Sequence, residues 1–182
     1  MKFRFFIALG VVVLSLCLVL IRFYVLPGTQ SVSVGDELYS CGYVPYADSF
    51  LRVDIDGKVL SVTGAVNDNL PVIDGIKFTR FSIGEYLRTE NDEAFKTIAI
   101  LIKLFKKYEL GDKFINKIYV ANLDDIHLYT NNVDVALGSV KDADEKIRTL
   151  KEIMANLDVA EDVKGLLDIR VIGRQYIFSV LT

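Results

Sequence analysis

A long apolar run near the N-terminus, residues 5–26, constrains the structure of this chain more than any other feature of its sequence. An α-helix rises about 1.5 Å per residue, so a helix over this run would cross the roughly 30 Å hydrocarbon core of a lipid bilayer. The only charged residue within the run is Arg22, one turn from its far end, where the side chain can extend to the lipid headgroups. The sequence therefore predicts a transmembrane helix over residues 5–26.

The charges around this helix predict its orientation. Lys2 and Arg4 precede it, and basic residues favour the cytoplasmic side of a membrane helix. Residues 1–4 are therefore expected in the cytoplasm, and the chain after residue 26 outside it. The alternative is a cleaved signal peptide, which would need a shorter apolar core and a cleavage site between small residues. Residues 24–29 hold no Ala-x-Ala pattern, so the sequence favours an uncleaved, single-pass anchor.

Charge and cysteine content disfavour several classes of partner and scaffold. The chain has a net charge of −3, and the N-terminal region contributes only basic residues, so the remaining part is more acidic still. This balance disfavours nucleic acid, which needs a basic face, and a polybasic lipid-binding surface. Cys17 and Cys41 fall on opposite sides of the expected membrane boundary and cannot pair within one chain. Cys41 is expected to be an unpaired thiol, with a reactive thiol or an intermolecular disulfide as alternatives.

Hydrophobic periodicity predicts the elements that follow a linker at residues 27–42. Strands are expected at residues 50–55, 58–62, 70–73, 76–78, 115–121, 126–129, 133–137, 167–172 and 175–181. Helices are expected to begin near Asn91 and Asp142, each followed by apolar residues three and four positions apart. Short turns such as Asp56-Gly57 join several neighbouring strands. The sequence therefore predicts an α+β domain over residues 43–182, with a mostly antiparallel sheet and two main helices.

The polar residues of this domain do not suggest a catalytic, cofactor or metal site. The one histidine, His127, lies within a predicted strand and has no clustered ligands or triad partners nearby in the sequence. Asp124 and Asp125 fall in a turn, and Asp142 and Asp144 at a helix start, where capping and solvation explain them better than a glycosidase pair does. No phosphate-binding loop is recognisable. The sequence therefore predicts a binding or scaffolding module, not an enzyme, without a small-molecule substrate.

Four short segments occur in an order that known proteins share. They are Asp-Gly-Lys-Val within residues 42–60, Leu-Pro-Val-Ile-Asp-Gly at 70–75, Val-Ala-Leu-Gly at 135–138 followed by 146–153, and Leu-Asp-Ile-Arg at 167–170. Behind one predicted transmembrane helix, they resemble the β-domain of the FtsQ/DivIB cell division proteins over residues 43–182, in the style of clostridial members. Members usually carry a POTRA domain before the β-domain, whereas residues 27–42 are too few for more than a remnant of one.

The resemblance implies a function and a site. FtsQ/DivIB proteins are divisome scaffolds that bind FtsL-like and FtsB/DivIC-like membrane proteins and help regulate septal peptidoglycan synthesis, which implies a location in the membrane at the division septum. In better-known members a partner adds a strand to the last β-strand, and the equivalent residues here are Arg174, Gln175, Tyr176, Ile177, Phe178, Ser179 and Val180. An edge strand offers unpaired N–H and C=O groups for such pairing. The alternative is a plain sheet edge whose aromatic residues lie in the core.

Two other functions remain open on the sequence. One is a membrane-anchored interaction, sensor or secretion-associated module that is unrelated to division, because an α+β sheet does not fix a function. The other is an extracytoplasmic enzyme such as a wall hydrolase, which the lack of recognisable site chemistry disfavours. A neighbouring set of genes for wall synthesis and division would favour the divisome scaffold.

Overall fold

The structure is a computed structural model that describes residues 40–66, 68–110, 114–156, 163–173 and 176–180. The predicted cytoplasmic segment 1–4, the predicted transmembrane helix 5–26 and most of the predicted linker 27–42 lie outside the described residues. Among the helices of the described residues, none is both long enough and apolar enough to cross a bilayer.

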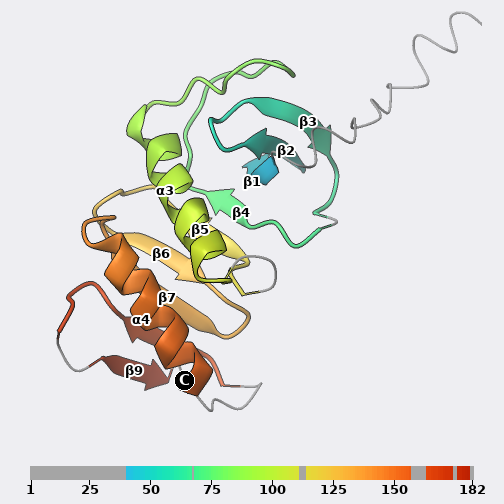
Figure 1. Ribbon diagram of the computed structural model, residues 1–182. Coiled ribbons are helices and arrows are strands. Elements are labelled where there is room, and N and C mark those ends of the chain that lie inside the picture. The colour runs from blue at the N-terminus through green and yellow to red at the C-terminus, as the bar shows by residue number, and fades with distance from the viewer. Residues whose placement is uncertain (1–39, 67, 111–113, 157–162, 174–175, 181–182) are drawn as a thin grey trace, which may run out of the picture. The chain divides into compact units, whose positions relative to one another are not determined.

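The strands of the described chain form a nine-stranded sheet in the order β3-β2-β1-β4-β5-β6-β7-β8-β9 (Figure 1). They are β1 (Ser40–Tyr46), β2 (Ser49–Asp54), β3 (Val59–Thr63), β4 (Val72–Asp74), β5 (Lys117–Tyr119), β6 (Ile126–Tyr129), β7 (Val133–Gly138), β8 (Gly165–Asp168) and β9 (Ile177–Val180). Two helices in the described part accompany the sheet, α3 (Glu93–Lys107) and α4 (Ala143–Asn156). The predicted α+β class with two main helices is confirmed.

Most strand pairs of the described sheet are antiparallel, as the sequence predicted, but three are parallel, so the sheet is mixed. The pairs β1 with β4, β4 with β5 and β7 with β8 are parallel, and the other neighbours are antiparallel. Helix α3 connects β4 to β5, and helix α4 connects β7 to β8. A crossover helix returns the chain to the end of the sheet from which it came, so the next strand runs in the same direction. The sequence prediction relied on tight turns between neighbouring strands, so it did not include these two helical crossovers.

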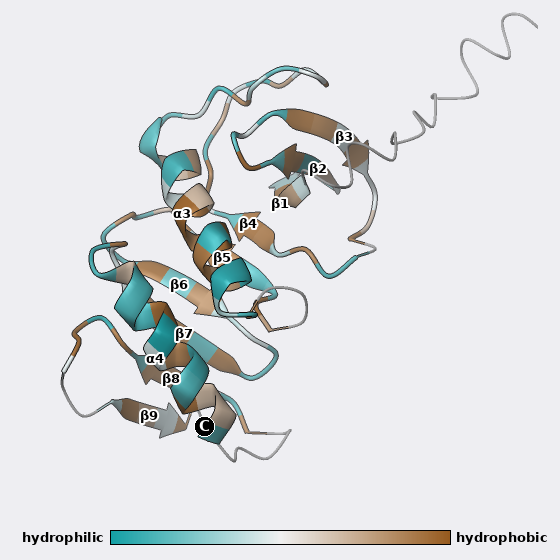
Figure 2. Cartoon of the chain, in the orientation of Figure 1, coloured by the Kyte–Doolittle hydropathy of each residue, from teal (hydrophilic) through white to brown (hydrophobic). Residues whose placement is uncertain are grey.

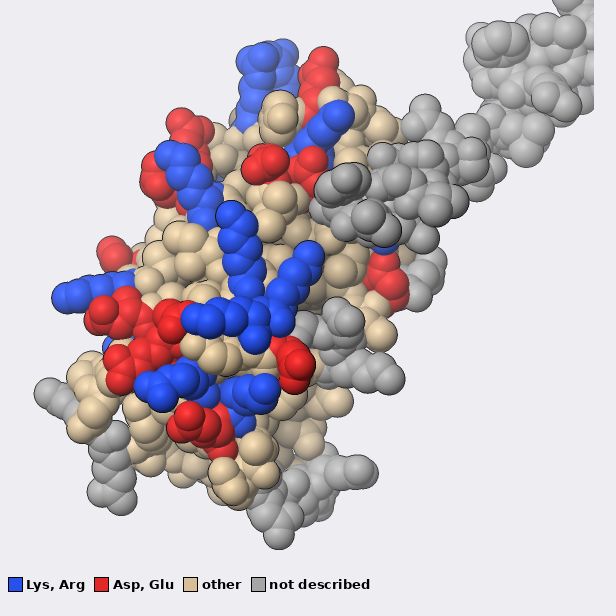
Figure 3. Space-filling model, viewed as in Figure 1, with Lys and Arg blue, Asp and Glu red and all other residues tan. Residues whose placement is uncertain are grey.

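Both helices lie on one face of the sheet (Figure 1). The two crossovers step in the same direction along the sheet between strands of the same orientation, and right-handed connections then place both helices on one side. Each helix buries an apolar stripe and directs polar and charged side chains outward (Figures 2 and 3). The fully buried core includes Leu51, Ile73, Ile98, Phe105, Leu128, Leu137 and Ile147.

Two local predictions differ from the structure. Strand β1 begins at Ser40, inside the predicted linker, and its first residues are buried. Tyr43 of this strand pairs in parallel with Val72 of β4, a distant partner that leaves no local signal in the sequence. Residues 76–78 were expected to form a strand but contribute only an isolated bridge between Phe78 and Thr89. The early start of β1 arises from long-range pairing, which periodicity does not report.

Cys41 is a free and buried thiol within β1. Its side chain is 3% exposed, and Sγ–H donates to the carbonyl oxygen of Asp54 at 3.1 Å. Burial, with the nearby Asp54 carboxylate as a second cause, raises the pKa of the Cys41 thiol to about 12. The reactive thiolate is therefore rare at neutral pH. Within the described residues Cys41 forms no disulfide, and its burial disfavours the reactive-thiol alternative in the folded domain.

Candidate partner-binding edge

The two outer strands of the described sheet, β3 and β9, differ in how their free edges are covered. Val59 of β3 directs both backbone groups outward, and both are bonded. Its N–H donates to the Glu85 carbonyl oxygen at 2.9 Å, and its own carbonyl accepts from the Gly84 N–H at 2.7 Å. The Leu87 N–H also donates to the carbonyl of Gly57, just before the strand, at 2.8 Å. A loop of the same chain therefore blocks the start of the β3 edge.

Strand β9 ends the sheet on the other side, the position that the sequence predicted for the edge. The predicted site residues Ile177, Phe178, Ser179 and Val180 form this strand. Tyr176 lies immediately before it, whereas the predicted site residues at positions 174 and 175 lie outside the described residues. In the described part of the chain, no strand pairs with the outer side of β9.

The hydrogen bonds of β8 show which backbone groups of β9 face the free edge. The N–H groups of Gly165 and Ile169 donate toward the β7 side, to carbonyl oxygens at 2.9 Å and 3.0 Å. Backbone groups alternate in direction along a strand, so Leu166 and Asp168 direct theirs toward β9. In the antiparallel β8–β9 pair, Leu166 lies opposite Ser179 and Asp168 lies opposite Ile177.

The backbone of β9 therefore divides into inward and outward groups. Ile177 and Ser179 lie opposite the β8 residues whose backbone groups face them, so their N–H and C=O groups are used within the sheet. The N–H and C=O groups of Phe178 and Val180 point the other way, toward the free edge. These are the groups that an added strand would bind.

The side chains of β9 divide differently from its backbone groups. Phe178 and Tyr176 pack against the hydrophobic core, whereas Ile177 and Val180 are 65% and 58% exposed. The ring of Phe178 lies over Gly165 of β8, where a β-carbon would come within 2.0 Å of the ring. Only glycine leaves room for this ring. The aromatic residues thus hold β9 on the sheet, and the aliphatic ones remain available to a partner.

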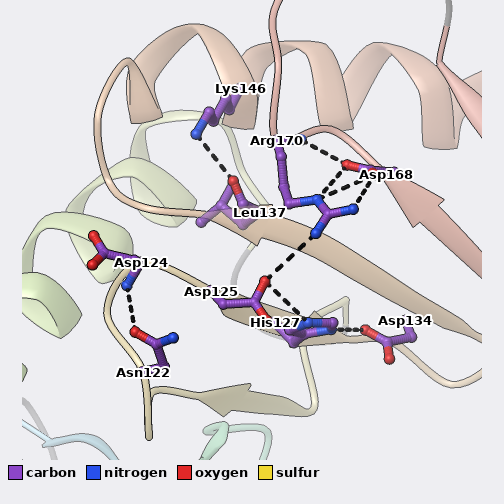
Figure 4. Close-up of polar contacts among 9 residues, drawn as sticks. All are labelled: Asn122, Asp124, Asp125, His127, Asp134, Leu137, Lys146, Asp168 and Arg170. Carbon is purple, nitrogen blue, oxygen red and sulfur yellow. Dashed lines mark hydrogen bonds and ion pairs between the residues drawn. The ribbon is translucent and has the colours of Figure 1, made fainter.

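A polar network on the face opposite the helices lies beside this edge (Figure 4). The Arg170 guanidinium binds the Asp168 carboxylate through Nε to Oδ1 at 3.0 Å and Nη2 to Oδ2 at 2.6 Å. Its Nη1 also lies 3.9 Å from Oδ1 of Asp125, next to His127, whose Nδ1 is 2.7 Å from Oδ1 of Asp134. The guanidinium holds the pKa of Asp168 below its ordinary value. The network ties β8, the strand that carries β9, to β6 and β7.

Two of the four sequence segments meet beside this network. Lys146, from the segment at 146–153, is 5% exposed, and its Nζ donates to the carbonyl oxygens of Leu137 at 3.0 Å and Ser139 at 2.9 Å. Burial lowers the pKa of the Lys146 ammonium. Gly138, from the segment at 135–138, passes close to Arg170, from the segment at 167–170. Part of the resemblance therefore rests on residues that build one corner of the sheet.

The buried role of Lys146 was not predicted, although its spacing within α4 indicates it. Lys146 follows Ala143 by three positions and precedes Leu150 by four, and both of these residues belong to the buried stripe of α4. Helical spacing thus places the lysine on the apolar face, where a buried ammonium needs acceptors.

Local contacts explain the acidic residues in the turn before β6 and at the start of α4. The Asp124 N–H donates to Oδ1 of Asn122 at 3.0 Å within a turn. Asp144 binds Lys107 and accepts from the Tyr108 hydroxyl at 3.0 Å, and these two partners lower the pKa of the Asp144 carboxyl. Among the described residues, no group of three or more His, Cys, Asp and Glu side chains is placed to hold a metal ion.

No model of a protein family matches the chain. The cell division protein DivIB of Clostridium botulinum strain Hall is 25% identical to it over 130 residues, which are 67% of this chain and 50% of that protein. The chain is similar to DivIB-type cell division proteins. DivIB of strain Loch Maree is 24% identical over the same shares of both chains, so the resemblance that the four segments indicate is confirmed. The chain spans about half the length of these DivIB relatives.

Proposed function

We propose that this chain is a single-pass membrane scaffold of the bacterial division machinery at the division septum. In this proposal it binds FtsL-like and FtsB/DivIC-like membrane proteins and helps regulate septal peptidoglycan synthesis. Similarity to two DivIB proteins supports the role in cell division. The proposed site is β9, to which a partner adds a strand through the backbone groups of Phe178 and Val180.

The contrast between the two edges of the described sheet carries this assignment. Both backbone groups of Val59 on β3 are bonded within the chain, whereas those of Phe178 and Val180 face a side where the described residues supply no strand. A hydrogen bond contributes about 0.5–1.5 kcal/mol net, so pairing along so short a strand gives modest affinity by itself. The exposed Ile177 and Val180 side chains add apolar area, worth about 25 cal/mol per Å² buried.

A proline substitution at Val180 tests the proposed site. Val180→Pro removes an outward N–H and leaves the inward hydrogen bonds of β9 in place. Val180→Ala is the matched control, because it shortens the same side chain and keeps the N–H. With the full chain in solubilised membranes, we expect Val180→Pro to lose co-purification with a tagged DivIC-like partner and Val180→Ala to retain most of it.

The folded state of the proline variant is checked in a Cys17→Ser background by the buried Cys41 thiol, which we expect to react with a thiol reagent only when β1 opens. Wild-type recovery of the partner by a Val180→Pro variant with a protected Cys41 would place the interface elsewhere. Proline at Ile177 or Ser179 is unsuitable, because those N–H groups face β8 and their loss would disturb the sheet.

A further inference from the structure

A small hollow lies in the segment between β4 and α3, the segment that also blocks the β3 edge. Its volume is about 180 Å³, and it is lined by Arg80, Phe81, Ser82, Glu85, Tyr86 and Arg88. Basic and acidic side chains gather around this segment at the top of the view in Figure 3. The hollow is near β3, at the end of the sheet order opposite to β9, and is separate from the proposed partner-binding strand.

The backbone around the hollow is held in place. Gly84 and Glu85 are bonded to Val59, and the Glu85 N–H donates to the Ser82 carbonyl at 3.2 Å, which closes a turn. The ring of Phe81 meets the ring of Tyr46 edge-on at 4.9 Å. The segment thus presents its polar side chains from a fixed backbone, which lowers the entropy cost of binding a ligand.

The two arginines of the hollow differ from the other described arginines. Arg52, Arg148 and Arg170 each lie within 4.0 Å of a carboxylate oxygen. For Arg80 and Arg88, both exposed, no ion pair is found among the described residues. Two guanidinium groups that line one hollow and form no ion pair with the described residues offer a site for an anion.

We propose that this hollow binds a carboxylate group of a peptide. The Arg80 and Arg88 forks match the two oxygens of a carboxylate, and the Ser82 hydroxyl offers a further donor. Glu85 on the same wall would accept a hydrogen bond from a peptide N–H or an ammonium beside the carboxylate. This acceptor favours a peptide segment, which has N–H groups beside its carboxylate, over a free phosphate.

The proposal is tested with the full chain in nonionic detergent and a defined probe. The probe is acetylated Ala-Glu-Ala with a free C-terminus, and the control probe is acetylated Ala-Gln-Ala amide. Titration is followed by the amide resonances of Ser82 and Glu85 in nuclear magnetic resonance spectra. We expect a saturating shift with the acidic probe, at least tenfold weaker binding of the control probe, and at least tenfold weaker binding by Arg80→Gln and Arg88→Gln.

Lys77→Gln is the matched control, because it removes the same charge from an exposed residue that does not line the hollow. It should leave binding within twofold of the wild type. Glu85→Gln should strengthen the binding of inorganic phosphate more than that of the acidic probe, because only the peptide loses a hydrogen-bond acceptor for its N–H. Tighter binding of phosphate than of the acidic probe by the wild type would overturn the assignment. Equal losses in Lys77→Gln and the two arginine variants, or equal binding of both peptides, would also overturn it.

Discussion

The side chain of Arg170 crosses the backbone of Gly138 so closely that a β-carbon at Gly138 would lie 3.1 Å from Cγ of Arg170. Gly138 also has a φ of 71°, a left-handed conformation that other residues rarely adopt. Through this contact the end of β7 supports the residue that holds Asp168 on β8. Gly138 and Arg170 belong to two of the segments on which the resemblance rests. Their contact supports β8, the strand next to β9.

Gly138→Ala should destabilise the protein by about 1–3 kcal/mol, because it adds left-handed strain and displaces Arg170. Chemical denaturation measures the loss. Gly64→Ala is the control without a close neighbour or left-handed backbone, and Gly84→Ala has the left-handed backbone but open space around it. An effect of Gly138→Ala no larger than that of Gly84→Ala would show that the contact with Arg170 contributes nothing.

Lys146→Met should cost about 2–4 kcal/mol of unfolding free energy. Methionine fills similar space, but the carbonyl groups of Leu137 and Ser139 lose their shared donor in a largely dry site. Lys151→Met, on the exposed side of the same helix, should change stability by less than about 0.5 kcal/mol. Similar values for the two variants in urea denaturation would contradict a structural role for the buried ammonium.

Asp168 should titrate below the ordinary aspartate pKa of about 3.9 in the folded protein, because the Arg170 guanidinium stabilises its charged form. A folded pKa below the unfolded one contributes stability that is complete above the unfolded pKa and is lost as the pH falls through the folded pKa. The pair is largely exposed, so that contribution is small. Carboxyl chemical shifts measure the midpoint directly, and Arg170→Gln should raise it. An unchanged midpoint would exclude Arg170 as the cause.

Cys41 should resist thiol reagents in the folded protein and react only after unfolding, because it is buried and its pKa is raised to about 12. It is therefore a poor probe of membrane topology. Asp48→Cys, at an exposed turn, is a better one in a Cys17→Ser background. If the domain lies outside the cytoplasm, an impermeant reagent labels this cysteine in intact protoplasts. Labelling only after lysis would reverse the proposed orientation.

Periodicity predicted the elements that form their own local pattern. The buried stripes of α3 and α4 and the β2–β3 hairpin follow from spacing and turn residues, whereas the position of β9 at the sheet edge was implied by the resemblance. Side chains alternate along a strand, so Tyr176 and Phe178 share one side of it, and both pack against the hydrophobic core.

Features that depend on distant partners could not be predicted. Burial of Cys41 follows from the pairing of β1 with β2 and β4, and a single sequence does not specify those neighbours. The same holds for Gly165, whose missing side chain matters only because the Phe178 ring lies over it. The inward and outward directions of the β9 backbone likewise require the register with β8, which a shift of one residue would reverse.

Amide hydrogen exchange of β9, with and without a bound DivIC-like partner, tests the central claim most directly. The N–H groups of Ile177 and Ser179 face β8 and should be protected in both states. Those of Phe178 and Val180 face the free edge and should exchange rapidly alone and become protected, by tenfold or more, in the complex. Complex formation without new protection at Phe178 and Val180 would contradict strand addition at this edge.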